Sequence, residues 1–258
     1  MWFDSTTGDH YKYPVSYYLE KLKNKVQRHQ NFILPTIVEE NFLNFQEVEE
    51  IKNKVIDLKY LWTYLDPVNG MDQSIPVRFL SQGMYSTIIK KYLEHVAFIK
   101  PVMAENFSFL YSKILSRIKE YFNIDTVFSE VNNYPGFHIF MLADGFKDGT
   151  YKFYNFHKDR FDLDLLGVSK GKIYSFVIPI SLPKDNGALL YSENNLLLKK
   201  IPASDSEYNQ LDYKVGMLGM WGSDIVHSIK PFQLSGDESR ITVQFHVNLT
   251  EDQAIIFW

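Results

Sequence analysis

The feature that most constrains the fold begins after Asp125, where the chain becomes a series of short runs rich in β-branched and aromatic residues, separated by Gly, Pro, Asn and Asp. Many short strands with turn residues between them are typical of an all-β barrel or sandwich. Aromatic residues form 16% of the chain, which also favours packed β-structure. Strands are predicted at residues 126–131, 137–142, 152–157, 172–182, 188–191, 196–201, 213–217, 225–229 and 240–248.

The residues before this point have a different pattern, which predicts helices. Residues 45–58 place apolar side chains along one stripe and Glu and Lys opposite them, as in an amphipathic helix. Helices are also predicted at residues 17–27 and 85–99, and Pro101 is expected to begin a further one, since proline is tolerated in a first turn. The stripe of residues 45–58 consists of Val48, Ile51, Val55 and Leu58.

The 258 residues are enough for one large domain with a buried core, and no Pro/Gly/Ser-rich linker marks the change of pattern. We therefore expect a single domain over residues 1–258, mainly β with supporting α-helices. Residues 1–125 would form a mostly helical support, and residues 126–258 would form the β core.

Composition excludes several classes of function. The chain has no cysteine, so disulfides, thiolate metal sites and cysteine nucleophiles are ruled out. Its net charge of −4 gives no indication of a nucleic-acid partner. No apolar run approaches the roughly 18 residues of a membrane span, and the first residues do not resemble a secretory signal. The expected location is the cytoplasm, without a membrane partner.

The last predicted strand alternates cleanly between apolar and polar residues, which therefore point to opposite faces. A polar face has two explanations, which the alternation cannot separate: it faces water, or it lines the polar mouth of a barrel. The apolar set is Ile241, Val243, Phe245 and Val247, and the polar set is Arg240, Thr242, Gln244, His246 and Asn248.

His157 and Asp159 form an H-x-D motif, which in a strand would place the imidazole and the carboxylate on one face. A lone H-x-D is weak evidence, because a surface pair arises by chance about as often. Asp162 and Asp164 lie nearby, but neither is two residues from a histidine. The motif becomes stronger when His227, in the short strand 225–229, is added.

Pro231 and a turn-rich stretch follow His227, and Arg240 then begins the final strand. This spacing predicts a hairpin that brings the strands of His227 and Arg240 side by side. Two histidines and one carboxylate form the facial triad of non-haem Fe(II) oxygenases, and Arg suits the binding of a further carboxylate. His138 and His246 could join a rival triad, although structural or substrate-contacting roles are favoured for both.

These residues resemble the Fe(II)/2-oxoglutarate-dependent dioxygenase superfamily over roughly the second half of the chain. The resemblance implies a double-stranded β-helix, or jelly roll, with helices supporting one sheet. The residues that carry it are His157-x-Asp159, His227, Arg240 in Arg240-Ile241-Thr242-Val243-Gln244, and Tyr134-Pro135-Gly136-Phe137 before the H-x-D.

The resemblance also implies chemistry. 2-Oxoglutarate would bind iron through its keto acid end, Arg240 would bind its other carboxylate, and Thr242 could add a hydrogen bond. Dioxygen would be consumed, with release of succinate and CO2 and oxidation of a substrate C–H bond. Related halogenases have a small residue where this chain has Asp159, so hydroxylation is expected.

The expected substrate is a small molecule, and residues 133–140 followed by the H-x-D resemble a subgroup that acts on free amino acids. Two other functions remain open: a cupin-like metal enzyme that does not use 2-oxoglutarate, and a non-catalytic β-sandwich binding module. A protein or peptide substrate is a further possibility within the oxygenase class. Candidate pocket residues are Tyr134, His138, Arg160 and Trp221.

Overall fold

The structure is a computed structural model that describes residues 34–64, 77–81, 89–142, 150–151, 156–159, 171–184, 187–193 and 207–258. The chain divides into two compact units, Met1–Ile33 and Leu34–Trp258, and every described residue belongs to the second. The predicted helix at 17–27 and the predicted strand at 196–201 lie outside the described residues, as do residues 152–155 of the strand predicted at 152–157.

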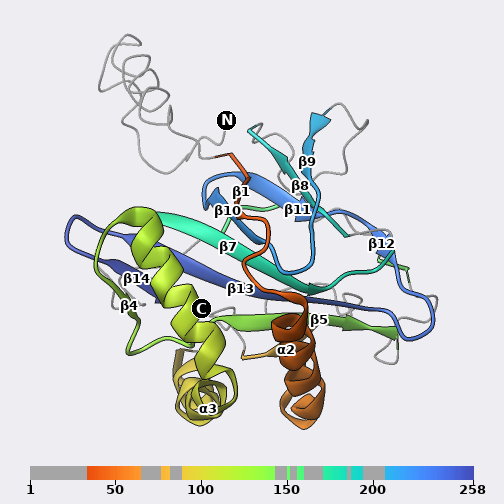
Figure 1. The fold of residues 1–258 in the computed structure, drawn as a ribbon, viewed down its shortest axis with the longest axis horizontal. Coiled ribbons are helices and arrows are strands. Elements are labelled where there is room, and N and C mark those ends of the chain that lie inside the picture. The colour runs from red at the N-terminus through yellow and green to blue at the C-terminus, as the bar shows by residue number, and fades with distance from the viewer. Residues whose placement is uncertain are drawn as a thin grey trace, which may run out of the picture. The chain divides into compact units, whose positions relative to one another are not determined.

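The described part of the second unit is mainly β with two α-helices (Figure 1), which is compatible with a jelly roll. The prediction of a mainly helical first half is not supported as it stands, because the described residues before 125 also contain three short strands that join the large sheet. The elements are β1 (Thr36–Glu39), α2 (Phe45–Asp57), the 3-10 turn η1 (Lys59–Leu61), β2 (Thr63–Tyr64), β3 (Arg78–Leu80), α3 (Ile89–Phe122), β4 (Thr126–Phe128), β5 (Gly136–Met141), β6 (Thr150–Tyr151), β7 (Lys172–Ser181), β8 (Leu189–Ser192), β9 (Asn209–Leu211), β10 (Leu218–Gly222), β11 (Val226–Ile229), β12 (Phe232–Gln233), β13 (Ser239–Leu249) and β14 (Ala254–Phe257).

The strands form a large sheet, a small sheet and a two-stranded pair. The large sheet runs β1-β10-β7-β13-β5-β3-β2, and β14 also pairs with β13 and continues to β4. The small sheet runs β11-β8-β9, and β12 pairs with β6. All of these pairings are antiparallel except β14 with β4. Strands from both halves of the chain therefore build one sheet.

The two long central strands, β7 and β13, are buried on both faces. On one face Phe245 stacks on Phe176 at 4.9 Å, and Phe176 in turn meets Phe122 of α3, so this apolar face lies under the helix. The opposite face carries the polar residues of β13, yet Arg240 and Thr242 are both 0% exposed. Of the two explanations for the polar face, the structure favours the interior over water.

Helix α2 follows from its sequence. Asn44 caps its N-terminus by accepting a hydrogen bond from the Glu47 backbone, and the Glu47 side chain accepts one from the Asn44 backbone, so the two complete a capping box. The buried side of the helix consists of Val48, Ile51 and Val55, and Leu58, which caps the helix, is buried as well, so the predicted stripe is confirmed.

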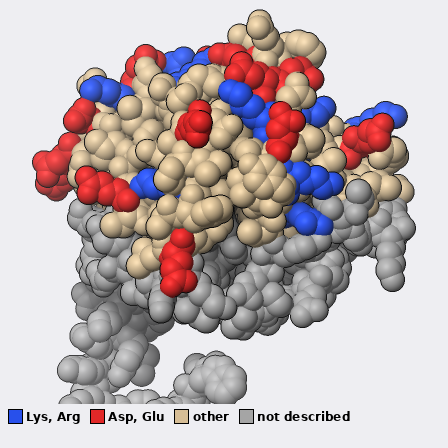
Figure 2. Space-filling model, turned by 90° about the horizontal axis from the view of Figure 1, so that it is seen from below, with Lys and Arg blue, Asp and Glu red and all other residues tan. Residues whose placement is uncertain are grey.

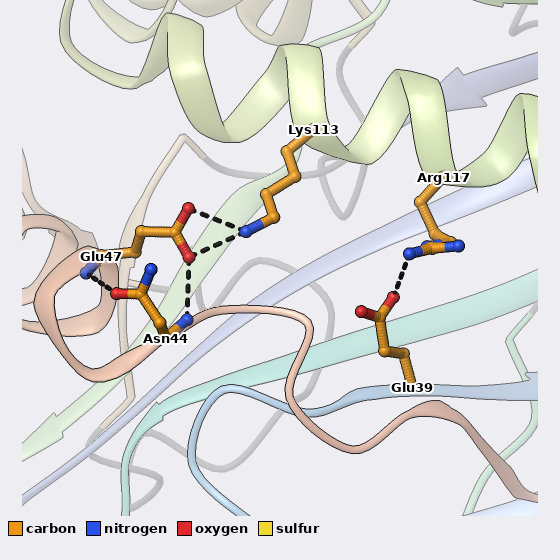
Figure 3. Close-up of polar contacts among 5 residues, drawn as sticks. All are labelled: Glu39, Asn44, Glu47, Lys113 and Arg117. Atoms are coloured by element: carbon orange, nitrogen blue, oxygen red, sulfur yellow. Dashed lines mark hydrogen bonds and ion pairs between the residues drawn. The ribbon is translucent and has the colours of Figure 1, made fainter.

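Two ion pairs connect helix α3 to the preceding elements (Figure 3). Lys113 contacts both carboxylate oxygens of Glu47 at 2.7 and 2.8 Å, and Arg117 contacts Glu39 of β1 at 2.7 Å. Glu47 therefore serves both the start of α2 and the packing of α3. On the face shown in Figure 2, basic and acidic side chains of the described residues are interspersed. None of the described helices combines the length and the apolar composition that a bilayer span requires.

Helix α3 differs from the prediction, because Pro101 lies inside it rather than at the start of a new helix. The regular backbone breaks instead at Phe107, with φ −123° and ψ 23°. The side-chain amide of Asn106 donates to the Val102 carbonyl at 2.9 Å, a bond that competes with the helical ladder just before the break.

Two strand predictions are also wrong. The strands of His227 and Arg240, β11 and β13, lie in different sheets and form no hairpin. After β11 the Lys230 backbone N–H bonds to the Ala188 carbonyl, and the chain pairs with β6 before it reaches β13. Residues 213–217 form a turn, because Gly216 has φ +79° and its N–H donates to Pro179 while its carbonyl accepts from Leu43.

Candidate metal centre

His157, Asp159 and His227 meet at one point of the described structure. Their ligand atoms all lie within 4.8 Å of one another. Asp159 Oδ1 is 3.7 Å from His227 Nε2 and 3.9 Å from His157 Nε2, and the two imidazole ring centres are 4.5 Å apart. Two imidazole nitrogens and one carboxylate oxygen converging on one point form a donor set that a single divalent ion can use.

Backbone pairing brings the two histidines together. His157 and His227 form an isolated antiparallel bridge at the edge of β11, in which each backbone N–H donates to the other carbonyl at 2.9 and 2.8 Å. Side chains of directly opposed residues lie on the same face of a sheet. Asp159 follows two residues after His157, where the backbone has no regular structure, so its side chain is not oriented by a strand ladder.

Hydrogen bonding and burial prepare His227 for metal binding. Its Nδ1 lies 3.0 Å from the Ile225 carbonyl, which can only accept, so Nδ1 carries the proton and Nε2 keeps its lone pair toward Asp159. Burial lowers the pKa of His227 to about 4, against the opposing effect of Asp159, so the imidazole is neutral at pH 7.

Asp159 is ionised at the same pH. Burial alone would raise its pKa, but the surrounding His227, His246 and His157 and a hydrogen bond from Ser175 outweigh burial and lower the pKa below its ordinary value. His227 therefore offers a neutral imidazole and Asp159 a carboxylate, the protonation states in which these side chains bind metals.

Arg240 is a fully buried cation without an anion among the described residues. Its Nε donates to the Gly187 carbonyl at 3.3 Å, whereas Nη1 and Nη2 have no hydrogen-bond partner in the described structure. Its guanidinium carbon lies 5.6 to 5.8 Å from three aromatic ring centres, those of Phe140, Tyr213 and Phe232. Burial lowers the pKa of Arg240, but arginine remains charged in proteins.

Thr242 and His138 lie directly opposite each other on β13 and β5, and Thr242 is two residues along the strand from Arg240. The Thr242 hydroxyl accepts a hydrogen bond from Gln244 Nε2 at 3.4 Å. His138 Nε2 is buried and has no partner among the described residues. Burial lowers the pKa of His138 to about 3; the charge of Arg240 lowers the pKa further and that of Asp159 opposes the decrease.

The other three predicted pocket residues differ in position. Trp221 is buried with its ring centre 5.2 Å from that of His227, so it forms a wall beside the triad. Tyr134 stacks on Tyr111 of α3 at 4.9 Å, in a cluster on the helix side of the fold. Arg160 lies outside the described residues.

Sequence reasoning missed Ser175, and it did not find that His246 contacts Ser175. Ser175 Oγ donates to Asp159 Oδ2 at 2.5 Å and lies 3.1 Å from His246 Nδ1. The only signal was one small polar residue inside the apolar run 173–180, and its significance depends on the register that places it opposite His246.

The sequence matches no protein-family model and no curated protein. Solved structures with a similar backbone include an N-substituted L-amino acid dioxygenase from Burkholderia ambifaria, at 11% identity and TM-score 0.45, covering 65% of this chain and 69% of that one. A non-haem α-ketoglutarate-dependent epimerase, SnoN from nogalamycin biosynthesis, has 12% identity and TM-score 0.47, covering 91% and 84%.

A third is HygX from Streptomyces hygroscopicus with nickel, 2-oxoglutarate and hygromycin B bound, at 11% identity and TM-score 0.44, covering 89% of this chain and 88% of that one. The names of these three proteins include both a dioxygenase and an epimerase. At identities of 11–12% and TM-scores below 0.5, these likenesses assign no reaction to the present chain.

Proposed function

We propose that this protein is an Fe(II)- and 2-oxoglutarate-dependent oxygenase of the dioxygenase superfamily, built on a double-stranded β-helix. The observation that carries the proposal is the presence of two features in one fold. His157, Asp159 and His227 converge within 4.8 Å, and Arg240 presents a buried guanidinium whose Nη1 and Nη2 have no partner among the described residues.

The triad fits Fe(II), which accepts imidazole and carboxylate ligands. His157 and His227 would supply Nε2 and Asp159 would supply Oδ1, because these are the atoms that face one another. When bound, the iron supplies the oxidation chemistry with dioxygen and 2-oxoglutarate, with release of succinate and CO2. The chain holds His227 neutral and Asp159 ionised, and the buried Trp221 beside His227 limits the access of water on that side.

Arg240 fits the far carboxylate of 2-oxoglutarate. Leaving a charge buried without a partner is costly, and a planar guanidinium suits a bidentate carboxylate. Phe140, Tyr213 and Phe232 surround the guanidinium with aromatic rings, so a carboxylate there would be shielded from water and its hydrogen bonds would be strengthened. Thr242 lies two residues from Arg240 on β13 and directly opposite His138 of β5. Both side chains would add hydrogen bonds to the bound 2-oxoglutarate or substrate.

We also propose hydroxylation of a C–H bond in a small molecule, with free amino acids as the first class to screen. Asp159 supports hydroxylation because a carboxylate occupies the position that related halogenases leave to chloride. The test is the release of succinate in the presence of Fe(II), dioxygen, 2-oxoglutarate and single amino acids. No succinate above the substrate-free rate with any small-molecule class would count against this substrate assignment.

The reaction class is tested by an anaerobic titration. Fe(II) followed by 2-oxoglutarate should give the weak visible absorption band of the iron chelate. Hydrogen bonds to charged groups contribute about 1.5–3 kcal/mol, so Arg240→Gln should weaken 2-oxoglutarate binding about 10- to 100-fold. Pyruvate lacks the far carboxylate, and its binding should be nearly the same in both proteins. Arg117→Gln, which removes a surface cation, is the matched control.

Two experimental results would favour a different function. Metal binding that does not respond to 2-oxoglutarate or to Arg240→Gln would indicate a cupin-like metal enzyme that uses no keto acid. No metal binding by the folded protein would indicate a non-catalytic β-sandwich binding module.

A further inference from the structure

We infer that Ser175 and His246 are positioning residues that hold Asp159 so that a single carboxylate oxygen faces the two imidazoles. The inference rests on the metal centre proposed above. Ser175 Oγ donates to Asp159 Oδ2 at 2.5 Å, while the other oxygen, Oδ1, faces His227 and His157. The serine thus occupies the carboxylate oxygen that the imidazoles do not face.

The contacts among Asp159, Ser175 and His246 have a defined direction of hydrogen-bond donation. A serine hydroxyl has one hydrogen, and Ser175 gives it to a carboxylate, which can only accept. The contact of 3.1 Å between Ser175 Oγ and His246 Nδ1 is therefore a bond in which the imidazole Nδ1–H donates. The result is a directed chain of donors from His246 to Ser175 to Asp159.

Strand pairing fixes the two donors in this chain. Ser175 of β7 lies directly opposite His246 of β13 on one side and Trp221 of β10 on the other, so the ladder holds it from both edges. Ser175 is 1% exposed. The His246 ring stacks on the Trp258 ring at 5.4 Å with an interplanar angle of 21°, which leaves it little rotational freedom.

Asp159 needs such support more than the histidines do. His157 and His227 are held by their mutual backbone bridge, whereas Asp159 lies on irregular backbone. Without the Ser175 hydroxyl, its carboxylate could rotate and offer both oxygens, or turn away. Groups that hydrogen-bond metal ligands typically change metal affinity by about 10- to 100-fold when removed.

The test is the affinity of the metal-free protein for Mn(II), which replaces Fe(II) and resists oxidation, measured from free Mn(II) by electron paramagnetic resonance. Ser175→Ala should weaken Mn(II) binding about 10- to 100-fold, and Ser175→Thr, which keeps the hydroxyl, should restore most of it. Ser181→Ala is the matched control, because Ser181 lies on the same strand and also donates one hydrogen bond, to the Ser239 carbonyl.

A second pair of variants tests the chain through His246. His246→Asn can keep an N–H near the position of Nδ1, whereas His246→Leu cannot, so the leucine variant should bind Mn(II) more weakly than the asparagine variant. This pair also decides the case if Ser175→Ala does not fold. A purely structural role would lower the unfolding free energy of the variants and leave their Mn(II) affinity at the wild-type value.

The outcomes separate this inference from the proposed function. If the wild-type protein binds Mn(II) and Ser175→Ala binds it equally well, the positioning role is refuted and the metal centre stands. If the folded wild-type protein binds no Mn(II), Fe(II) or other divalent ion, the proposed function itself fails.

Discussion

Replacing Gly187 by alanine should disturb the anion site proposed at Arg240 without touching the proposed metal ligands. Gly187 has φ +50°, a conformation that costs an L-residue about 1–2 kcal/mol. An added Cβ would lie 2.9 Å from Arg240 Nε, 3.0 Å from Arg240 Cδ and 3.2 Å from a ring carbon of Phe232. Such contacts require the buried guanidinium or its aromatic wall to move.

Gly236 is the matched control, because it has φ +55° and its added Cβ would meet nothing within 4 Å. Gly236→Ala therefore carries the backbone strain alone and should cost about 1 kcal/mol, since alanine also reduces the freedom of the unfolded chain. Gly187→Ala adds overpacking, which typically costs about 1–3 kcal/mol, for a total of about 2–4 kcal/mol.

Urea unfolding of the metal-free proteins measures these free energies, and anaerobic titration with 2-oxoglutarate measures the anion site. Gly187→Ala should weaken 2-oxoglutarate about tenfold, which corresponds to about 1.4 kcal/mol, and leave Mn(II) affinity unchanged. Equal destabilisation by the two alanines, or unchanged 2-oxoglutarate affinity in Gly187→Ala, would refute the close packing of Gly187 against Arg240.

Two further predictions concern stability. Burial lowers the pKa of His227 and His246 to about 4 and that of His138 to about 3, from 6.5 in the unfolded chain, so the unfolded state takes up protons first as the pH falls. The unfolding free energy should thus decline as the pH falls from 6.5 to 4, by up to about 1.4 kcal/mol per pH unit for each histidine. A urea midpoint that stays constant over this range would contradict the burial of these rings. Glu47→Ala breaks the capping box of α2 and the ion pair with Lys113, and should lower the unfolding free energy measured in urea by about 1–2 kcal/mol. The control Glu50→Ala removes an exposed ion pair within the helix and should lower it by only about 0.3–0.5 kcal/mol.

Strand prediction succeeded where a run was long and mostly buried. The predicted runs 172–182 and 240–248 correspond to β7 and β13, the centre of the large sheet. Some short strands, such as β8 and β11, were also predicted, whereas β1, β2 and β3 were missed. β1 and β3 pair with β10 and β5, which lie far along the chain. Pairing partners cannot be read from a local pattern.

The hairpin error has a similar cause. Pro231 and the turn residues after it correctly indicated a change of direction, but a turn pattern does not say which sheet the chain enters next. The structure carries the chain from β11 in the small sheet, through β12, to β13 in the large sheet. His227 and Arg240 therefore share an interior because the two sheets meet there, and not because their strands are paired.

The sequence identified those residues of the candidate site whose type alone indicates their chemistry. The H-x-D spacing and a later histidine identified the three side chains whose ligand atoms converge, since His and Asp are residue types that commonly bind metals. Ser175 could not be found in this way, because a serine in a strand is ordinary until the register places it between Asp159 and His246.

The surroundings of Arg240 explain how a charged residue on the polar face of β13 can be buried. Attraction to each surrounding ring contributes about 0.5–2 kcal/mol, so Phe140, Tyr213 and Phe232 offset part of the loss of water around the guanidinium. They cannot accept the hydrogen bonds of Nη1 and Nη2, which have no described partner. A carboxylate would supply both the opposite charge and the missing acceptors, so under the proposed function the same residues that lower the stability of the free protein would select a dicarboxylate.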